Sequence, residues 1–165
     1  MEYSIKKAKI GDEKIFSYIQ TESWKEAFKD ILPSDVLIKC TQIDKVTNIY
    51  RKMLETSQGN GYILSVNNKP FMIAWWDKSR SEEMNDYAEL LCIHSLPECW
   101  RMGFGRKMMD RIINDIKQSG YNHVMLWVFE KNERARKFYE AIGFKTYGKI
   151  KPNVTPVEIC YEKNL

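Results

Sequence analysis

The 165-residue sequence lacks any uninterrupted apolar run long enough to cross a bilayer. Its N-terminus, Met1-Glu2-Tyr3-Ser4-Ile5, also lacks the basic-then-apolar pattern of a secretory signal. These two absences exclude the usual membrane and secreted classes, so we expect a cytoplasmic protein that does not bind membranes. No internal repeat, low-complexity tract or linker interrupts the chain, which predicts a single domain over residues 1–165.

Cysteine and histidine are scarce. The four cysteines form no C-x-x-C pair, and two isolated histidines cannot complete a recognisable metal site. We therefore predict no bound metal and reduced thiols, of which Cys99 lies nearest to the glycine turn described below. The net charge of +4 is too small to indicate nucleic acid as a partner.

Hydrophobic residues make up 44% of the chain, enough for a packed core, and their periodicity alternates between strand and helix patterns. Strands are predicted at residues 3–8, 61–66, 71–76, 87–95 and 123–129, with a final hairpin at 146–150 and 157–162. Helices are predicted from residue 11, again from residue 21, and over 35–54, 103–119 and 132–142. This order predicts an α/β domain with a mixed central sheet, in which residues 87–129 form a parallel strand–helix–strand unit.

A glycine turn, Arg101-Met102-Gly103-Phe104-Gly105-Arg106, lies where a buried strand gives way to a helix. Glycine lets a ligand approach the backbone, and the unpaired amides at a helix N-terminus favour an anion. We predict that this turn binds a pyrophosphate, with Arg101 and Arg106 as cationic donors. A tight turn that needs glycine only for packing is the alternative; the G-x-G-x-x-G and P-loop patterns are both absent.

A second motif follows, Asn132-Glu133-Arg134-Ala135-Arg136-Lys137-Phe138-Tyr139-Glu140-Ala141-Ile142-Gly143-Phe144. Together with the segment Ile93-His94-Ser95-Leu96-Pro97-Glu98-Cys99-Trp100-Arg101-Met102-Gly103-Phe104-Gly105, it resembles the GCN5-related N-acetyltransferase (GNAT) superfamily, whose members bind acetyl-CoA. Trp100 stands where Gln or Arg is usual.

The resemblance implies a sheet of about seven strands that splays between the fourth and fifth, with coenzyme A in the gap. The cofactor-binding residues that it implies are Ile93, His94, Ser95, Arg101, Met102, Gly103, Phe104, Gly105, Arg106 and Asn132. Tyr139 takes the position of the general acid that protonates the leaving sulfur. One more half-buried aromatic is the alternative for Tyr139, and a helix N-cap is the alternative for Asn132.

The attacking amine must lose a proton to a base or to a chain of water molecules. Glu89 is our candidate base because it interrupts an apolar strand; a carboxylate paired with a lysine is the alternative. Trp24, Trp75 and Tyr87 are candidate acceptor-binding residues, since aromatic walls can hold an amine or a cation. Trp127 replaces the base of relatives that acetylate protein N-termini, which argues against a ribosomal-protein substrate.

The predicted function is acetyl transfer from acetyl-CoA to a primary amine of a small molecule or peptide, directly within a ternary complex. A non-catalytic acyl-CoA-binding sensor is the alternative. The sequence leaves open the acceptor, acyl groups longer than acetyl, and the oligomeric state, including a homodimer.

Overall fold

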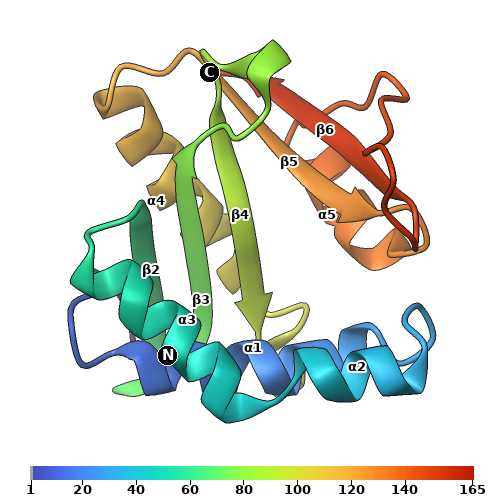
Figure 1. Cartoon of the computed structure of the whole chain (residues 1–165). Coiled ribbons are helices and arrows are strands. Elements are labelled where there is room, and N and C mark those ends of the chain that lie inside the picture. The colour runs from blue at the N-terminus through green and yellow to red at the C-terminus, as the bar shows by residue number, and fades with distance from the viewer. Residues whose placement is uncertain (1) are drawn as a thin grey trace.

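A central sheet of six strands organises the computed structural model, which describes residues 2–165 (Figure 1). The strands lie side by side in chain order: β1 (Tyr3–Lys7), β2 (Asn60–Val66), β3 (Lys69–Lys78), β4 (Ala88–Ser95), β5 (His123–Phe129) and β6 (Glu158–Asn164). All neighbours pair antiparallel except β4 and β5, which are parallel. The mixed α/β sheet and the parallel β4–α4–β5 unit are thus confirmed.

The sheet splits between β4 and β5. Only two residue pairs join these strands, Ala88 with Val124 and Glu89 with Met125, and beyond them the strands diverge (Figure 1). The splay therefore lies between the fourth and fifth strands, as predicted.

The sheet has six strands where about seven were predicted, because the first half of the final hairpin is not a strand. Lys145 and Ile150 make only isolated bridges, to Glu162 and Ile159 of β6. Gly148 lies between them with a φ of 80°, and this left-handed conformation breaks an extended ladder.

Five helices cover the sheet: α1 (Glu13–Ala27), α2 (Ser34–Cys40), α3 (Ile43–Glu55), α4 (Phe104–Gln118) and α5 (Glu133–Ala141). A separate helix from residue 21 was wrong, since α1 continues through Thr21 without a break. The single helix predicted over 35–54 was also wrong, because the structure has α2 and α3 in its place. Helix α2 is capped by Thr41, whose hydroxyl donates to the Leu37 carbonyl 2.7 Å away.

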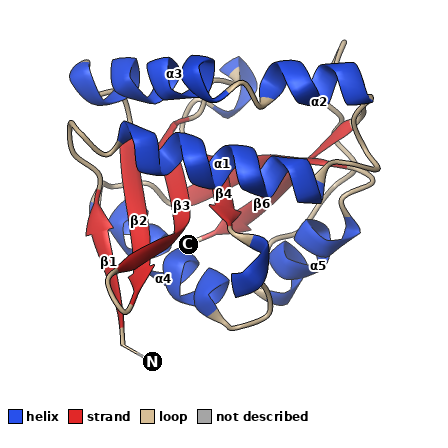
Figure 2. Ribbon diagram, turned by 90° about the horizontal axis from the view of Figure 1, so that it is seen from below, coloured by secondary structure: helices blue, strands red, loops and turns tan. Residues whose placement is uncertain are grey.

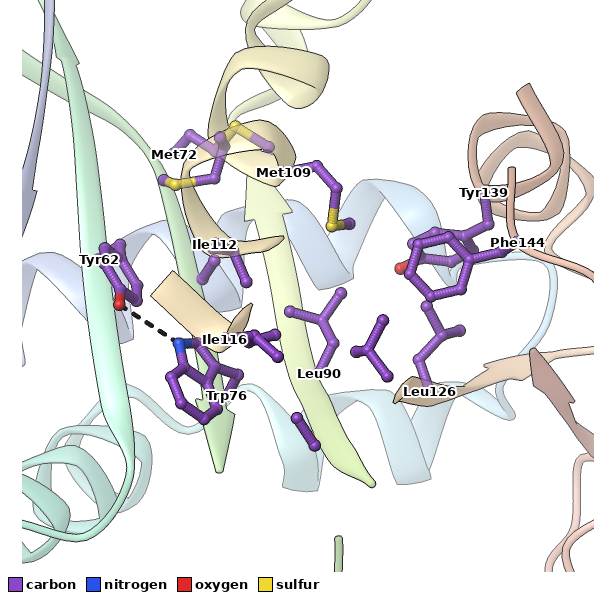
Figure 3. Packing of buried hydrophobic residues seen from close by; sticks show 14 of the residues in the cluster. Tyr62, Met72, Trp76, Leu90, Met109, Ile112, Ile116, Leu126, Tyr139 and Phe144 are labelled. Carbon is purple, nitrogen blue, oxygen red and sulfur yellow. Dashed lines mark hydrogen bonds between the residues drawn. The ribbon is translucent and has the colours of Figure 1, made fainter. Parts of the chain in front are cut away.

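The helices form two layers, with α1 to α3 on one face of the sheet and α4 and α5 on the other (Figure 2). Alternate residues of each strand point to opposite faces, so Ile73 packs with Phe16 of α1, whereas Ala74 packs with Ile112 of α4. Figure 3 shows the core between the sheet and α4, which includes Ile112 and Leu90. No helix within residues 2–165 is both long and apolar enough for a membrane span.

Candidate active site

A cavity of about 860 Å³ opens where β4 and β5 part. Its wall includes most of β4 (residues 90–95), the end of β5, the glycine turn and the inward face of α5. The C-terminal half of α1 closes it on the opposite face of the sheet. A long ligand can therefore reach from the glycine turn into the centre of the molecule.

The glycine turn presents unpaired backbone donors. Between residues 2 and 165, no acceptor is found for the backbone N–H groups from Arg101 to Arg106. Gly103 is the N-cap of α4 and has a φ of 81°. A Cβ built on it would meet nothing within 4 Å. The amides thus face open space at the positive end of the α4 dipole, which suits the phosphates of a nucleotide cofactor.

Gly105 has a different role from Gly103. A Cβ at Gly105 would lie 3.1 Å from the Phe138 ring, so the missing side chain lets α4 pack closely against α5. The two interpretations of the turn, ligand approach and tight packing, therefore apply to different glycines.

Three arginines, Arg101, Arg106 and Arg134, line the cavity near the turn. Arg134 stacks on Trp100, with its guanidinium carbon 3.2 Å from the ring centroid. Burial, together with the nearby charge of Arg101, lowers the pKa of Arg134. Arg134 was not among the residues predicted to bind the cofactor, because the motif N-x-x-A leaves its position unspecified.

The predicted cofactor-binding residues mostly share this cavity. Ile93, His94, Ser95, Phe104 and Asn132 all line it. The Ser95 carbonyl accepts from the Trp100 indole over 3.1 Å, so that this acceptor already fastens the turn. Met102, in contrast, is 42% exposed and lies outside the cavity wall.

Asn132 caps α5. Its side-chain oxygen accepts from the Ala135 backbone N–H at 3.3 Å. The N-cap interpretation is confirmed, and the same residue contributes to the cavity wall.

Tyr139 places a free hydroxyl in the cavity. Its ring packs against those of Phe138 and Phe144, and Figure 3 shows Tyr139 beside Phe144; the residue is only 8% exposed. The Tyr139 hydroxyl has no hydrogen-bond partner within residues 2–165. Every fully buried side-chain oxygen in that range does have a partner, so the Tyr139 oxygen is not fully buried and is open to the cavity. Burial raises its pKa well above the usual value of 10, which keeps the phenol protonated.

His94 contacts Trp24 in the wall of the cavity. The Trp24 indole donates to His94 Nε2 over 3.1 Å, which leaves the neutral ring's proton on Nδ1. Burial lowers the pKa of His94 from 6.5 to about 4, so the imidazole is a weak base.

Glu89 is held by Arg80. Its carboxylate accepts from the Arg80 Nη2 at 2.6 Å, Nε at 3.2 Å and backbone N–H at 3.0 Å. Glu89 is only 2% exposed and is absent from the cavity wall, whereas Arg80 is part of it. This arrangement favours the alternative of a paired carboxylate, with arginine in place of the lysine expected.

The three aromatic candidates for acceptor binding separate. Trp24 lines the cavity, and Trp75 reaches it only from the core, where it is 2% exposed and donates to the Gln58 carbonyl. Tyr87 lies outside the wall, stacked on His123 with 4.8 Å between ring centroids. The wall of this cavity therefore does not include Tyr87, and its contact with the acceptor stays a prediction.

Three cavity residues, Cys92, Trp127 and Glu158, were not selected from sequence as part of the site. Trp127 was noted only as a departure from relatives, and Glu158 begins β6, after the second motif has ended. No cluster of His, Cys, Asp or Glu in the described part of the chain could hold a metal.

A model of the acetyltransferase (GNAT) family matches residues 23–144, which include both motifs and most of the cavity wall. The chain belongs to this family. GNAT enzymes take their acyl group from acetyl-CoA, and the α4 amides and the splay of this protein fit such a cofactor.

Several relatives share the fold. An uncharacterised N-acetyltransferase, YuaI of Bacillus subtilis, is 25% identical over 140 residues, which are 84% of this chain and 78% of YuaI. The PaiA N-acetyltransferase of Thermoplasma acidophilum, solved with coenzyme A, superposes with a TM-score of 0.81 at 18% identity over 100% of both chains. The Escherichia coli ribosomal-protein-S18-alanine N-acetyltransferase gives a TM-score of 0.71 at 21% identity, over 99% and 94% of the two chains.

Proposed function

We propose that this GNAT protein is an acetyl-CoA-dependent N-acetyltransferase that acts on a primary amine of a small molecule or peptide. The observation that carries the proposal is the free Tyr139 hydroxyl, which shares one cavity with the unpaired amides of the glycine turn. When bound, acetyl-CoA supplies the acetyl group as a thioester. The α4 amides, Arg101 and Arg134 would hold its phosphates, and the splayed end of β4 would receive its pantetheine arm.

Tyr139 acts as the general acid in this proposal. It donates its proton to the sulfur that leaves as the amide bond forms. Cys92, a thiol lining the same cavity, has its pKa raised from 9.0 to about 11 by burial. A leaving thiolate in these surroundings is destabilised in the same way, so it needs the proton that the raised pKa of Tyr139 retains.

The two cysteines that line the cavity support direct transfer. Burial raises the pKa of both Cys92 and Cys99, so neither thiol is activated as a nucleophile. Acetyl transfer then needs no covalent enzyme intermediate, and the acceptor amine attacks the thioester itself.

Water is the proposed proton acceptor for the attacking amine. Glu89 is fully engaged by Arg80, and the lowered pKa of His94 makes it a poor base near neutrality. An amine that enters the cavity from the side of α1 would lose its proton to solvent before attack.

The test combines binding and turnover. Titration calorimetry should show saturable acetyl-CoA binding, and a thiol-release assay with a panel of primary amines should show turnover. Binding without turnover for every amine would instead support the acyl-CoA sensor, and the absence of binding would exclude both functions.

A further inference from the structure

A lysine of the chain occupies a cation-binding arrangement at the edge of the cavity. Lys151 Nζ lies 3.3 Å from the Glu158 carboxylate and 5.7 Å from the centroid of the Trp127 ring. A carboxylate and an indole face together form a favourable environment for an ammonium group. Trp127 and Glu158 line the cavity, whereas Lys151 reaches them from the loop outside its wall.

The charges around Glu158 balance only while a cation is present. Arg80 feels the charge of Glu158 and is already paired with Glu89 at 2.6 Å. With Lys151 the group holds two cations and two anions. If Lys151 swings into solvent, Arg80, Glu89 and Glu158 retain one net negative charge, which another cation would neutralise.

This arrangement lies on the opposite side of β5 from Tyr139. Tyr139 packs in the core that contains Leu126 and Val128, and alternation along the strand turns Trp127 to the other face. Glu158 pairs with Phe129 and shares that other face. An ammonium held by Trp127 and Glu158 is therefore not the nitrogen that reacts beside Tyr139.

We propose that Trp127 and Glu158 form an ammonium subsite for a second, unreacted amino group of the acceptor, and that Lys151 is its intramolecular stand-in. The acceptor class is an aliphatic molecule with two amino groups, one bound here and the other acetylated. The inference rests on the proposed function, because it concerns the acceptor side of the same cavity. The ring of buried Phe28 packs edge to face on that of half-buried Phe129, with 5.1 Å between the centroids, and both supply an apolar surface near this subsite.

The experiment compares 1,5-diaminopentane with pentylamine, which has the same carbon chain and only one amino group. The intact protein should acetylate the diamine with at least tenfold higher kcat/KM. Glu158→Gln should raise KM for the diamine about tenfold, the effect of losing one charged hydrogen bond. It should change KM for pentylamine and the Kd for acetyl-CoA less than about twofold.

Two further variants separate the subsite from a general effect of charge. Glu83→Gln removes the carboxylate of another lysine pair, with Lys149, outside the cavity wall, and should leave both KM values unchanged. Lys151→Met should lower KM for the diamine, because the internal competitor is gone. Equal effects of Glu158→Gln on both amines, or no effect on either, would overturn the subsite.

Failure of the proposed function has a different signature, since no amine would then release thiol from acetyl-CoA. In that case, calorimetry of the CoA-saturated protein tests the subsite directly. Tighter binding of 1,5-diaminopentane than of pentylamine, lost in Glu158→Gln, would support it. Equal or absent binding of the two amines would overturn it.

Discussion

The guanidinium of Arg134 lies 3.2 Å from the centre of the Trp100 ring, which ties the first turn of α5 to the loop before α4. The same indole donates to the Ser95 carbonyl at the end of β4. One tryptophan thus connects three segments that surround the proposed phosphate site. It does so at the position where relatives usually have Gln or Arg.

Replacing Arg134 should weaken cofactor binding. We expect Arg134→Ala to raise the Kd for acetyl-CoA about tenfold, since one charged contact is worth about 1.4 kcal/mol. Calorimetry measures the effect, with Lys137→Ala as the control because Lys137 is 78% exposed on the same helix. An equal loss in both variants would show that only the overall charge matters.

Tyr139→Phe should lower kcat without weakening acetyl-CoA binding. A general acid contributes about 100-fold or more to the rate, so we expect a loss of that order. Thiol release measures kcat, and calorimetry measures Kd. Tyr147→Phe, at a side chain that is 76% exposed, is the matched control. Unchanged kcat in Tyr139→Phe would contradict the assignment of the acid.

Gly103→Glu should abolish cofactor binding. The new side chain would enter the open space before the α4 amides and bring a negative charge to a site that favours anions. Gly120→Glu is a close control, since Gly120 has a φ of 91°, equally open space, and a position just past the other end of α4. Both should lose about 1–2 kcal/mol of stability from the left-handed conformation, and only Gly103→Glu should fail to bind. Normal binding by Gly103→Glu would exclude the proposed phosphate site.

Much of the fold follows from periodicity, and the errors lie where local signals are weak. The break between α2 and α3 falls at Thr41-Gln42, with neither proline nor glycine to mark it. The strand expected over residues 146–150 had a suitable composition, but Gly148, with a φ of 80°, interrupts it, and only the isolated bridges of Lys145 and Ile150 to β6 remain.

The residues of the site also divide into those that the sequence predicted and those that it did not. The phosphate turn and Tyr139 belong to two continuous segments, so their residue order alone indicated them. Arg80 comes from the loop between β3 and β4, and Glu158 comes from the start of β6. Only the strand pairing of the sheet, with β6 beside β5, brings Glu158 to the same cavity. Glu89 looked available in the sequence because its partner Arg80 lies nine residues earlier, in the loop between β3 and β4, where no pattern indicates the pairing.

His94 should make stability depend on pH. The folded protein keeps the imidazole neutral down to about pH 4, whereas the unfolded chain takes up a proton near pH 6.5. The unfolded state therefore binds more protons between these values, and stability present above pH 6.5 is lost as the pH falls toward 4. Urea unfolding should show a fall from pH 7 to pH 5 that is about 1–2 kcal/mol smaller in His94→Gln. An identical fall in His94→Gln would contradict the prediction.

The cysteines should react in the order of their exposure. Cys40 is exposed, whereas burial raises the pKa of Cys92 to about 11. Iodoacetamide at pH 8 should therefore label Cys40 first, as peptide mass spectrometry can determine.

The double variant Cys92→Ala, Cys99→Ala should keep thiol release within about tenfold of the unaltered protein. Complete loss of turnover in a folded double variant would argue for a covalent route.

The two residue pairs between β4 and β5 also have a mechanical consequence. Ala88 with Val124 and Glu89 with Met125 are the whole backbone seam between a four-stranded half and a two-stranded half. The seam lies at one end of the gap, and we expect it to act as a pivot if the halves rotate. The Arg80–Glu89 ion pair sits at this pivot, 2.6 Å long. We therefore expect a change in the width of the gap to alter the backbone pairing beside Glu89.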